Sequence, residues 1–207
     1  MKNILIVVTL VLSGMLSAQD IKLPAPQTTG GMPLMEALNQ RQSKRDYAAQ
    51  DLSKQQLSNL LWAAYGYNRG QQEKHTAPSS MNYQEIEIYV TLSSGLYFYD
   101  VKNHVLVQKN KKDLRSATGK QDFVKDAPLN IVYVANYANN EKINEENWLH
   151  YSYANVGFIS QNIYLYCASE GLGTVVRGWF DKDALESALQ LPQDNVVILT
   201  QSVGVVK

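Results

Sequence analysis

The sequence is poor in cysteine and has no surplus of charge of either sign. Its single cysteine, Cys167, excludes a disulfide within one chain, and its apolar surroundings predict a small buried residue. The 207 residues contain 19 lysines and arginines against 19 aspartates and glutamates. A nucleic-acid-binding domain normally has a basic surplus, so that class of protein is not indicated. The length suits one domain with a sizeable core.

Several short catalytic and metal-binding motifs are also missing. The three histidines, His75, His104 and His150, form no H-x-x-x-H pair and give little support for a zinc site. Neither the G-x-S-x-G motif of serine hydrolases nor the G-x-x-x-x-G-K-[ST] phosphate loop occurs. We therefore expect no metal centre, and we expect His104, which opens a predicted strand, to lie at the surface.

The first eighteen residues have the pattern of a secretory signal peptide. A charged start at residues 1–3 precedes an apolar run at residues 4–12, and small residues stand before Gln19. The run is too short to span a bilayer comfortably. We expect export to the periplasm with cleavage near Ala18, and an uncleaved membrane anchor is the alternative.

The remaining pattern predicts an α+β domain at residues 34–207, after an extended lead-in at residues 19–33 that is rich in proline and glycine. Alternating or continuous apolar runs predict strands at residues 86–91, 96–99, 104–108, 129–137, 174–176 and 196–203. Helical spacing and caps predict helices at residues 34–40, 53–65, 113–118, 148–170 and 182–189. Polar loops are expected at residues 67–84 and 139–147.

The helix predicted at residues 148–170 is apolar on most of its circumference. Ala154, Gly157 and Ser160 place small residues at a spacing of three, which lets another element approach closely. A helix that is hydrophobic nearly all round is normally buried. We therefore expect this helix at the centre of the domain or at a contact between subunits, and thirteen tyrosines also suit interfaces.

Two arginines, Arg41 and Arg45, flank Gln42 and Ser43 where the first predicted helix ends. The planar guanidinium group matches phosphate oxygens two at a time, and the amide and hydroxyl could add neutral hydrogen bonds. Taken alone, however, two such arginines more often face water or pair with carboxylates. The segment therefore indicates a phosphate site only in combination with other stretches of the sequence.

A second stretch, with Pro78, Ser79, Ser80 and Asn82, stands just before the strand at residues 86–91. Its irregular backbone and polar side chains can present donors and acceptors to a planar heterocycle. The simpler interpretation is an ordinary loop that enters a strand.

A third stretch runs through Gly171 and Gly173 to Arg177 and Gly178. The glycines are explained as a helix stop and a place of close packing. Backbone N–H groups of the last two residues, after a short strand, could face a ligand. Trp179 could wall such a pocket, although a core position is the commoner role for tryptophan.

The three stretches, in this order and at these separations, resemble the nitroreductase family of FMN-dependent oxidoreductases over about residues 34–207. The resemblance implies a mixed, mostly antiparallel sheet flanked by helices, and a homodimer with FMN at the subunit interface. It also implies that hydride from NAD(P)H or another donor reaches N5 of the flavin and passes to nitroaromatic, quinone-like or related acceptors.

The resemblance also implies roles for individual residues. Arg41 would hold the FMN phosphate with support from Gln42 and Ser43. Arg45 would face O2 and N1 of the flavin, and it is the expected catalytic residue because its charge stabilises the reduced flavin. Lys207 is the candidate for phosphate contacts that a longer C-terminal arm makes in some members. The full set of implied cofactor-binding residues is Arg41, Gln42, Ser43, Arg45, Pro78, Ser79, Ser80, Asn82, Arg177, Gly178 and Lys207.

Two alternatives stay open at this point. One is an exported flavin-binding module without turnover, which is favoured if the nicotinamide reductants of the cell interior are out of reach. The other is a flavin-dependent oxidase of the azoline-oxidising type. That chemistry needs proton-transfer residues near the flavin, and the sequence offers no candidate for them.

Overall fold

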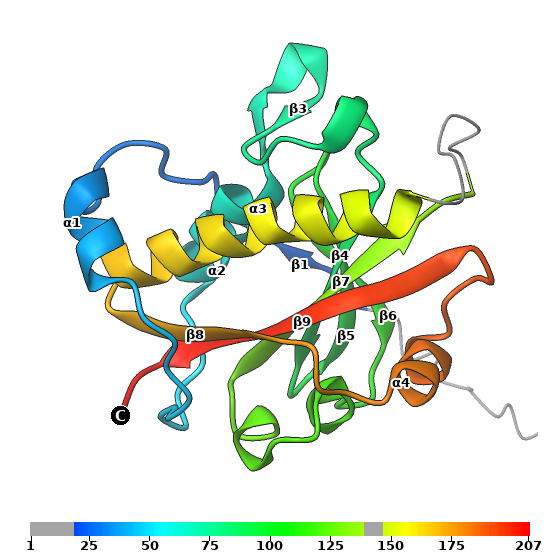
Figure 1. Cartoon of the computed structure of the whole chain (residues 1–207). Coiled ribbons are helices and arrows are strands. Elements are labelled where there is room, and N and C mark those ends of the chain that lie inside the picture. Colours follow the sequence, from blue (N-terminus) through cyan, green and yellow to red (C-terminus); the bar gives the residue numbers. More distant parts are fainter. Residues whose placement is uncertain (1–18, 139–146) are drawn as a thin grey trace, which may run out of the picture.

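A seven-stranded antiparallel sheet, in the order β1-β6-β5-β4-β7-β9-β8, forms the middle of the protein (Figure 1). The computed structural model describes residues 19–138 and 147–207. The predicted signal peptide and most of the predicted loop at residues 139–147 lie outside these ranges. The strands of the sheet are β1 (Ile21–Lys22), β4 (Ile86–Leu92), β5 (Gly95–Asp100), β6 (Val105–Asn110), β7 (Leu129–Asn136), β8 (Leu172–Arg177) and β9 (Asn195–Val205).

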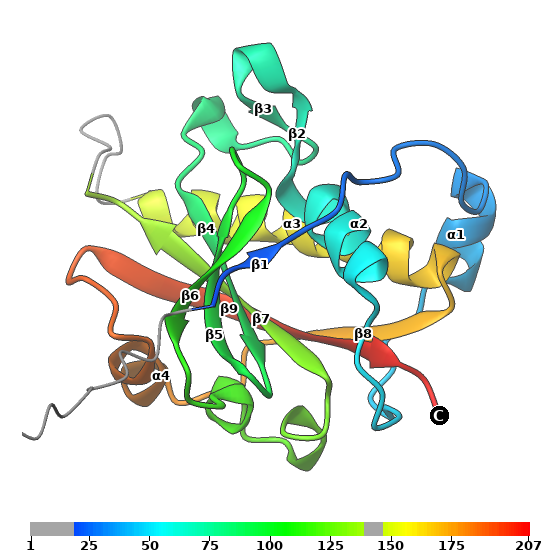
Figure 2. The same ribbon diagram turned by 180° about the vertical axis from the view of Figure 1, so that it is seen from behind.

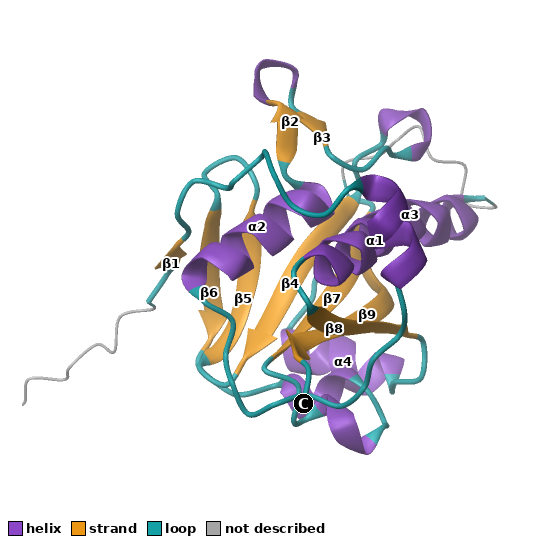
Figure 3. Cartoon of the chain, turned by 90° about the vertical axis from the view of Figure 1, so that its left-hand side faces the viewer, coloured by secondary structure: helices purple, strands orange, loops and turns teal. Residues whose placement is uncertain are grey.

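Helices lie on both faces of this sheet (Figure 3). On one face, α2 and α3 pack against the strands, with α1 beside α3. On the other face, α4 packs with a short 3-10 helix, Arg115–Thr118, which in turn contacts a second one, Asp122–Val124. This arrangement confirms the predicted α+β fold. The helices are α1 (Leu34–Gln40), α2 (Lys54–Tyr65), α3 (Trp148–Ser169) and α4 (Lys182–Leu189).

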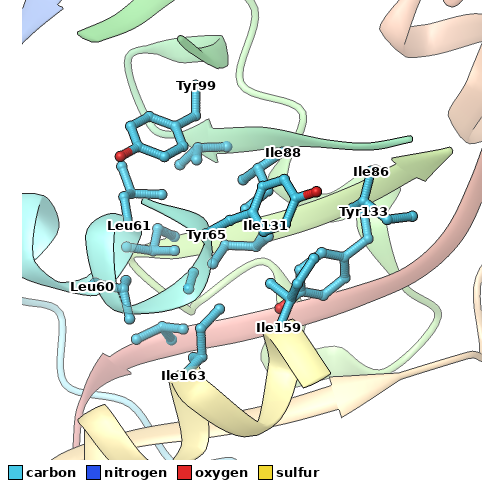
Figure 4. Packing of buried hydrophobic residues seen from close by; sticks show 14 of the residues in the cluster. Leu60, Leu61, Tyr65, Ile86, Ile88, Tyr99, Ile131, Tyr133, Ile159 and Ile163 are labelled. Atoms are coloured by element: carbon cyan, nitrogen blue, oxygen red, sulfur yellow. The ribbon is translucent and has the colours of Figure 1, made fainter. Parts of the chain in front are cut away.

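The larger core lies between α2, α3 and the sheet (Figure 4). Alternation along β4 points Ile86 and Ile88 to this side. Leu60 and Leu61 of α2 and Ile159 of α3 meet them from the helical layer, and all of these side chains are buried. The hydrophobic spacing visible in the sequence thus sets which face of each element is buried.

The start of α2 has the predicted capping box. The Ser53 hydroxyl accepts a hydrogen bond from the Gln56 backbone N–H at 3.2 Å, and the Gln56 side chain accepts one from the Ser53 N–H at 3.0 Å. Two helix-end donors are therefore satisfied locally.

Two segments expected to be irregular contain strands. The lead-in contributes β1, which pairs with the outer edge of β6 through Ile21 and Leu106 (Figure 2). The loop at residues 67–84 contains a hairpin of β2 (Tyr67–Arg69) and β3 (Lys74–His75), followed by a 3-10 turn at Ser80–Asn82. These short pairings carry too few residues to show a periodic pattern in the sequence.

The long helix α3 is buried on one face only. Its open face carries Leu149, Tyr151, Tyr153 and Phe158, each 39–47% exposed. A Cβ atom added to Gly157 on this helix would meet nothing within 4 Å. The apolar surface that predicts burial therefore remains uncovered in a single protomer. No helix in the described ranges is both long and apolar enough to cross a membrane.

Candidate functional site

The segment at residues 41–45 begins where α1 ends and passes the C-terminal half of α3 (Figure 1). The Arg41 guanidinium carbon lies 5.4 Å from the centre of the Tyr164 ring. The Tyr164 hydroxyl is 2.9 Å from the Ser43 hydroxyl and accepts a hydrogen bond from the Val176 N–H at 3.1 Å. Tyr164 therefore joins this segment to β8.

The same segment concentrates positive charge that the fold leaves unpaired. Among the described residues, no carboxylate lies within 4.0 Å of the charged groups of Arg41, Lys44 or Arg45. Arg41 and Lys44 are half-buried, and Arg45 is exposed. An unpaired guanidinium beside an ammonium is a suitable site for a phosphate group.

A cavity of about 380 Å³ opens beside these cations. It lies between the end of α1 and the end of α3, where Gly171 follows the helix. The predicted phosphate ligand Arg41 and its predicted support Gln42 both line it. Other lining residues include Lys44, Tyr164 and Leu172.

The C-terminus runs along the same segment. The Lys207 ammonium is 3.0 Å from Asp46, and the Lys207 N–H donates to the Asp46 carbonyl at 3.3 Å. The Lys44 N–H donates to the Thr174 carbonyl of β8 at 3.0 Å. The structure thus brings Lys207 beside the arginine segment, although its charge already has a carboxylate partner.

Arg177 and Gly178 lie at the end of β8, and the Arg177 side chain is not open to a ligand. Arg177 is only 5% exposed, and it donates to the Thr118 carbonyl at 2.8 Å and to Asn130 Oδ1 at 3.0 Å. Burial lowers the pKa of this guanidinium to about 10. Its side chain is therefore part of the fold, whereas the predicted role of the two backbone amides stays a prediction. Trp179, next in sequence, is 61% exposed, so it does not take the core position that is commoner for tryptophan.

The second predicted stretch is held by the other half of α3. The backbone N–H and hydroxyl of Ser80 both donate to Asn155 Oδ1, at 2.9 and 3.0 Å. The Ser79 hydroxyl accepts from the Gln84 N–H at 3.1 Å, and Pro78 is exposed. Exposed Asn82 accepts from the Lys74 ammonium at 2.6 Å.

Within one protomer, the first and second predicted stretches stay apart. Their contacts on α3, Tyr164 and Asn155, are nine residues apart, which corresponds to about 14 Å along a helix. The structure therefore places residues 41–45 along β8, with Lys207 near the start of that strand and Arg177 at its end, and it leaves residues 78–82 elsewhere. Sequence reasoning missed Tyr164 and Asn155, because polar residues on an apolar helix carry no motif. It also missed Glu85, a single carboxyl group just before β4 that accepts from Asn155.

Comparison with known proteins agrees with the fold. A sequence model of the Nitroreductase family matches residues 38–205. A nitroreductase homologue from Methanocaldococcus jannaschii is 30% identical over 190 residues, which cover 87% of this chain and 94% of that protein. The chain therefore belongs to the nitroreductase family, and it is an oxidoreductase.

Solved structures agree as well. A nitroreductase-family protein from Ralstonia eutropha JMP134 is 45% identical, with a TM-score of 0.87 over 91% of this chain and 90% of that one. An FMN-dependent nitroreductase from Clostridium difficile R20291 is 20% identical, with a TM-score of 0.59 over 84% of this chain and 87% of that one. At that identity the second likeness concerns the fold alone.

Proposed function

We propose that this protein is an FMN-dependent oxidoreductase whose phosphate site is the segment at residues 41–45. The observation that carries the proposal is the unpaired charge of Arg41, Lys44 and Arg45 beside the cavity of about 380 Å³. When bound, FMN would supply two-electron chemistry between NAD(P)H or another donor and nitroaromatic, quinone-like or related acceptors.

In this proposal each residue of the segment has a separate task. Arg41 binds the phosphate, while Gln42 and the Ser43 hydroxyl add neutral donors. Tyr164 holds Ser43 in place through its hydroxyl. Arg45 supplies positive charge where negative charge develops on the reduced cofactor, and no proton transfer is required of it.

We also propose that two copies of the chain form the working unit. The exposed apolar side chains of α1 and α3 would be covered by a second copy, and surfaces of this kind mark interaction sites in soluble proteins. A second copy would also bring its own residues 78–82 to the arginine segment, from which they are separated within one protomer. The exposed apolar residues are Leu34, Met35, Leu38, Leu149, Tyr151, Tyr153 and Phe158.

Flavin titration tests the phosphate site. Because a hydrogen bond to a charged group contributes about 1.5–3 kcal/mol, Arg41→Ala is expected to weaken FMN binding by at least about tenfold. Lys125→Ala is the control, since Lys125 is an exposed cation elsewhere on the surface. Equal affinity of the Arg41 variant and the control would place the phosphate elsewhere, and a wild-type protein that retains no FMN would refute the proposal.

Anaerobic reduction tests turnover. Bleaching of the bound flavin by NADH or NADPH supports an enzyme. If neither NADH nor NADPH reduces the bound flavin, an exported flavin-binding module is favoured. Export is itself a proposal from residues 1–18, and cell fractionation with detection of the mature N-terminus tests it.

Light scattering tests the dimer. Phe158→Glu places a charge on the apolar face of α3, so we expect it to shift the protein from dimer to monomer. Lys125→Glu should leave the dimer intact. A wild-type protein that is monomeric at micromolar concentration would refute the two-copy arrangement.

A further inference from the structure

Glu85 is a buried carboxyl group between the stretch at residues 78–82 and β4. It is 4% exposed. It accepts hydrogen bonds from the Ser152 hydroxyl at 2.8 Å and from Asn155 Nδ2 at 2.9 Å. The Tyr137 hydroxyl lies 2.7 Å from the Ser152 hydroxyl. Because the proton of Ser152 is used on Glu85, Tyr137 donates to Ser152, and the chain of hydrogen bonds points toward Glu85.

The orientation of the Asn155 amide follows from its two neighbours. The Ser80 backbone N–H can only donate, so the amide oxygen of Asn155 must face it. The amide nitrogen must then face Glu85, which accepts from it through both oxygens, at 2.9 and 3.2 Å. The Ser80 N–H and the Glu85 carboxyl group thus require the same orientation of the Asn155 amide, and a change at Glu85 disturbs the acceptor of Ser80.

The backbone that Ser80 anchors is strained. Met81, Asn82 and Gln84 have φ angles of 49°, 59° and 54°, in the left-handed region that non-glycine residues seldom adopt. Each such residue costs about 1 kcal/mol or more, and the conformation persists only where its surroundings determine it. Two hydrogen bonds from Ser80 to one side-chain oxygen supply such a constraint.

We propose that Glu85 and Asn155 are a positioning pair that holds residues 78–84 in the conformation that contacts the flavin. The inference about the flavin rests on the proposed function, whereas the inference about the backbone does not. Neither side chain is assigned contact with the cofactor. Both act through Ser80, which the resemblance to the family places at the flavin.

An exchange of the two functional groups tests the pair. In Glu85→Gln, Oε1 can still accept from Ser152 and Asn155, but Nε2 replaces the oxygen that also accepts from Asn155, so two amide N–H groups face each other. Asn155→Asp places a second carboxyl group against the first. In the double variant the glutamine can donate to the aspartate, whose other oxygen still accepts from Ser80. We expect each single variant to weaken FMN binding about tenfold, and the double variant to recover to within about threefold of wild type.

Glu87→Gln is a matched control, because Glu87 lies on β4 only two residues after Glu85. Glu87 accepts from Asn136 Nδ2 at 2.7 Å and from Asn195 Nδ2 at 3.3 Å, and its side chain takes no part in the contacts with Ser80. Its variant should bind FMN within about twofold of wild type, because the positioning contacts are intact. If Glu87→Gln weakened FMN binding as much as Glu85→Gln does, the replacement of either carboxylate would have the same effect. That result would overturn the proposal.

Hydrogen exchange of the flavin-free protein separates this proposal from the proposed function. Deuterium uptake at residues 78–84 should rise in each single variant and return toward wild type in the double variant. This result would support the pair even if wild-type protein bound no FMN. Unchanged uptake in the single variants, or no rescue in the double variant, would overturn it.

If Glu85→Gln does not fold, Asn155→Ala removes the acceptor of Ser80 directly and leaves the charge of Glu85 unchanged. The same rise in uptake at residues 78–84 is expected from that variant, and unchanged uptake there would again overturn the proposal.

Discussion

The segment at residues 41–45 and the end of β8 are joined through Tyr164, yet they use their arginines in opposite ways. Arg41 is half-buried, lies over an aromatic ring and has no carboxylate partner in the described part of the chain. Arg177 is almost fully buried and donates to neutral acceptors of the fold. An arginine is available to a ligand only where the fold leaves its donors unused.

The pocket around Arg177 is built for that side chain. Its guanidinium carbon lies 6.0 Å from the centre of the Phe123 ring, on the face of the sheet away from Tyr164. A Cβ atom at Gly119 would overlap the guanidinium group. The 3-10 helices after β6 therefore pack on β8 through a buried cation, which is costly unless hydrogen-bonded.

The largest expected effect is the loss of the Arg177 contacts. Arg177→Met removes two buried charge-assisted hydrogen bonds, to the Thr118 carbonyl and to Asn130 Oδ1, so we expect the free energy of unfolding to fall by about 3 kcal/mol. The two acceptors keep weaker neutral donors, the hydroxyls of Thr200 and Ser202. Arg41→Met should change it by less than about 0.5 kcal/mol, because the fold uses few of its donors. Urea denaturation of flavin-free protein measures both. If both variants lost the same free energy of unfolding, the two arginines would not differ in their contribution to the fold.

Substitutions of two glycines, one beside buried Arg177 and one on the open face of α3, are expected to change stability by smaller amounts. Gly119→Ala forces a methyl group into the Arg177 pocket and should destabilise the protein by about 2 kcal/mol. Gly157→Ala meets open space in one protomer and should stabilise an isolated α3 helix by about 1 kcal/mol. If a second copy packs on that face, the Gly157 variant should instead raise the dimer dissociation constant. Concentration-dependent denaturation distinguishes these outcomes.

Local signals in the sequence predict much of the fold, and long-range contacts account for the rest. The strand predicted at residues 86–91 and the capping box at Ser53 depend on neighbouring residues, and both are confirmed. The alternation along that strand suggests that one face is exposed, but Tyr89 and Thr91 are buried as well, because β4 is covered on both faces. His104, expected at the surface, is half-buried, so that expectation is wrong. Its neighbours come from β5 and α2: the Tyr99 hydroxyl lies 2.8 Å from Nδ1, and the Ser58 hydroxyl lies 2.7 Å from Nε2.

The candidate site divides in the same way. Residues 41–45 carry a recognisable pattern, and the structure places them beside a cavity. Glu85 and Asn155 are 70 residues apart in sequence and have no shared pattern, so only the fold reveals their contact. A short motif thus identifies residues that face outward more readily than the buried groups that hold them in place.

The smallest expected effect concerns pH and the buried surroundings of His104. Burial lowers the pKa of His104 below its ordinary value of 6.5. As the pH falls through this value, the unfolded chain binds the proton first, so the stability that neutral His104 contributes is complete above about pH 6.5 and is lost below it. Burial also lowers the pKa of His75, which adds a loss of the same sign.

His104→Gln should therefore reduce the fall in unfolding free energy between about pH 7.5 and pH 5.5 by a few tenths of a kcal/mol, without abolishing it. His150→Gln, at an exposed position, should leave the fall unchanged. Denaturation midpoints across this pH range measure the difference. If the unfolding free energy fell more steeply with pH in the His104 variant than in wild type, the native protein would favour the protonated imidazole. The contacts with Tyr99 and Ser58 would then not favour the neutral ring.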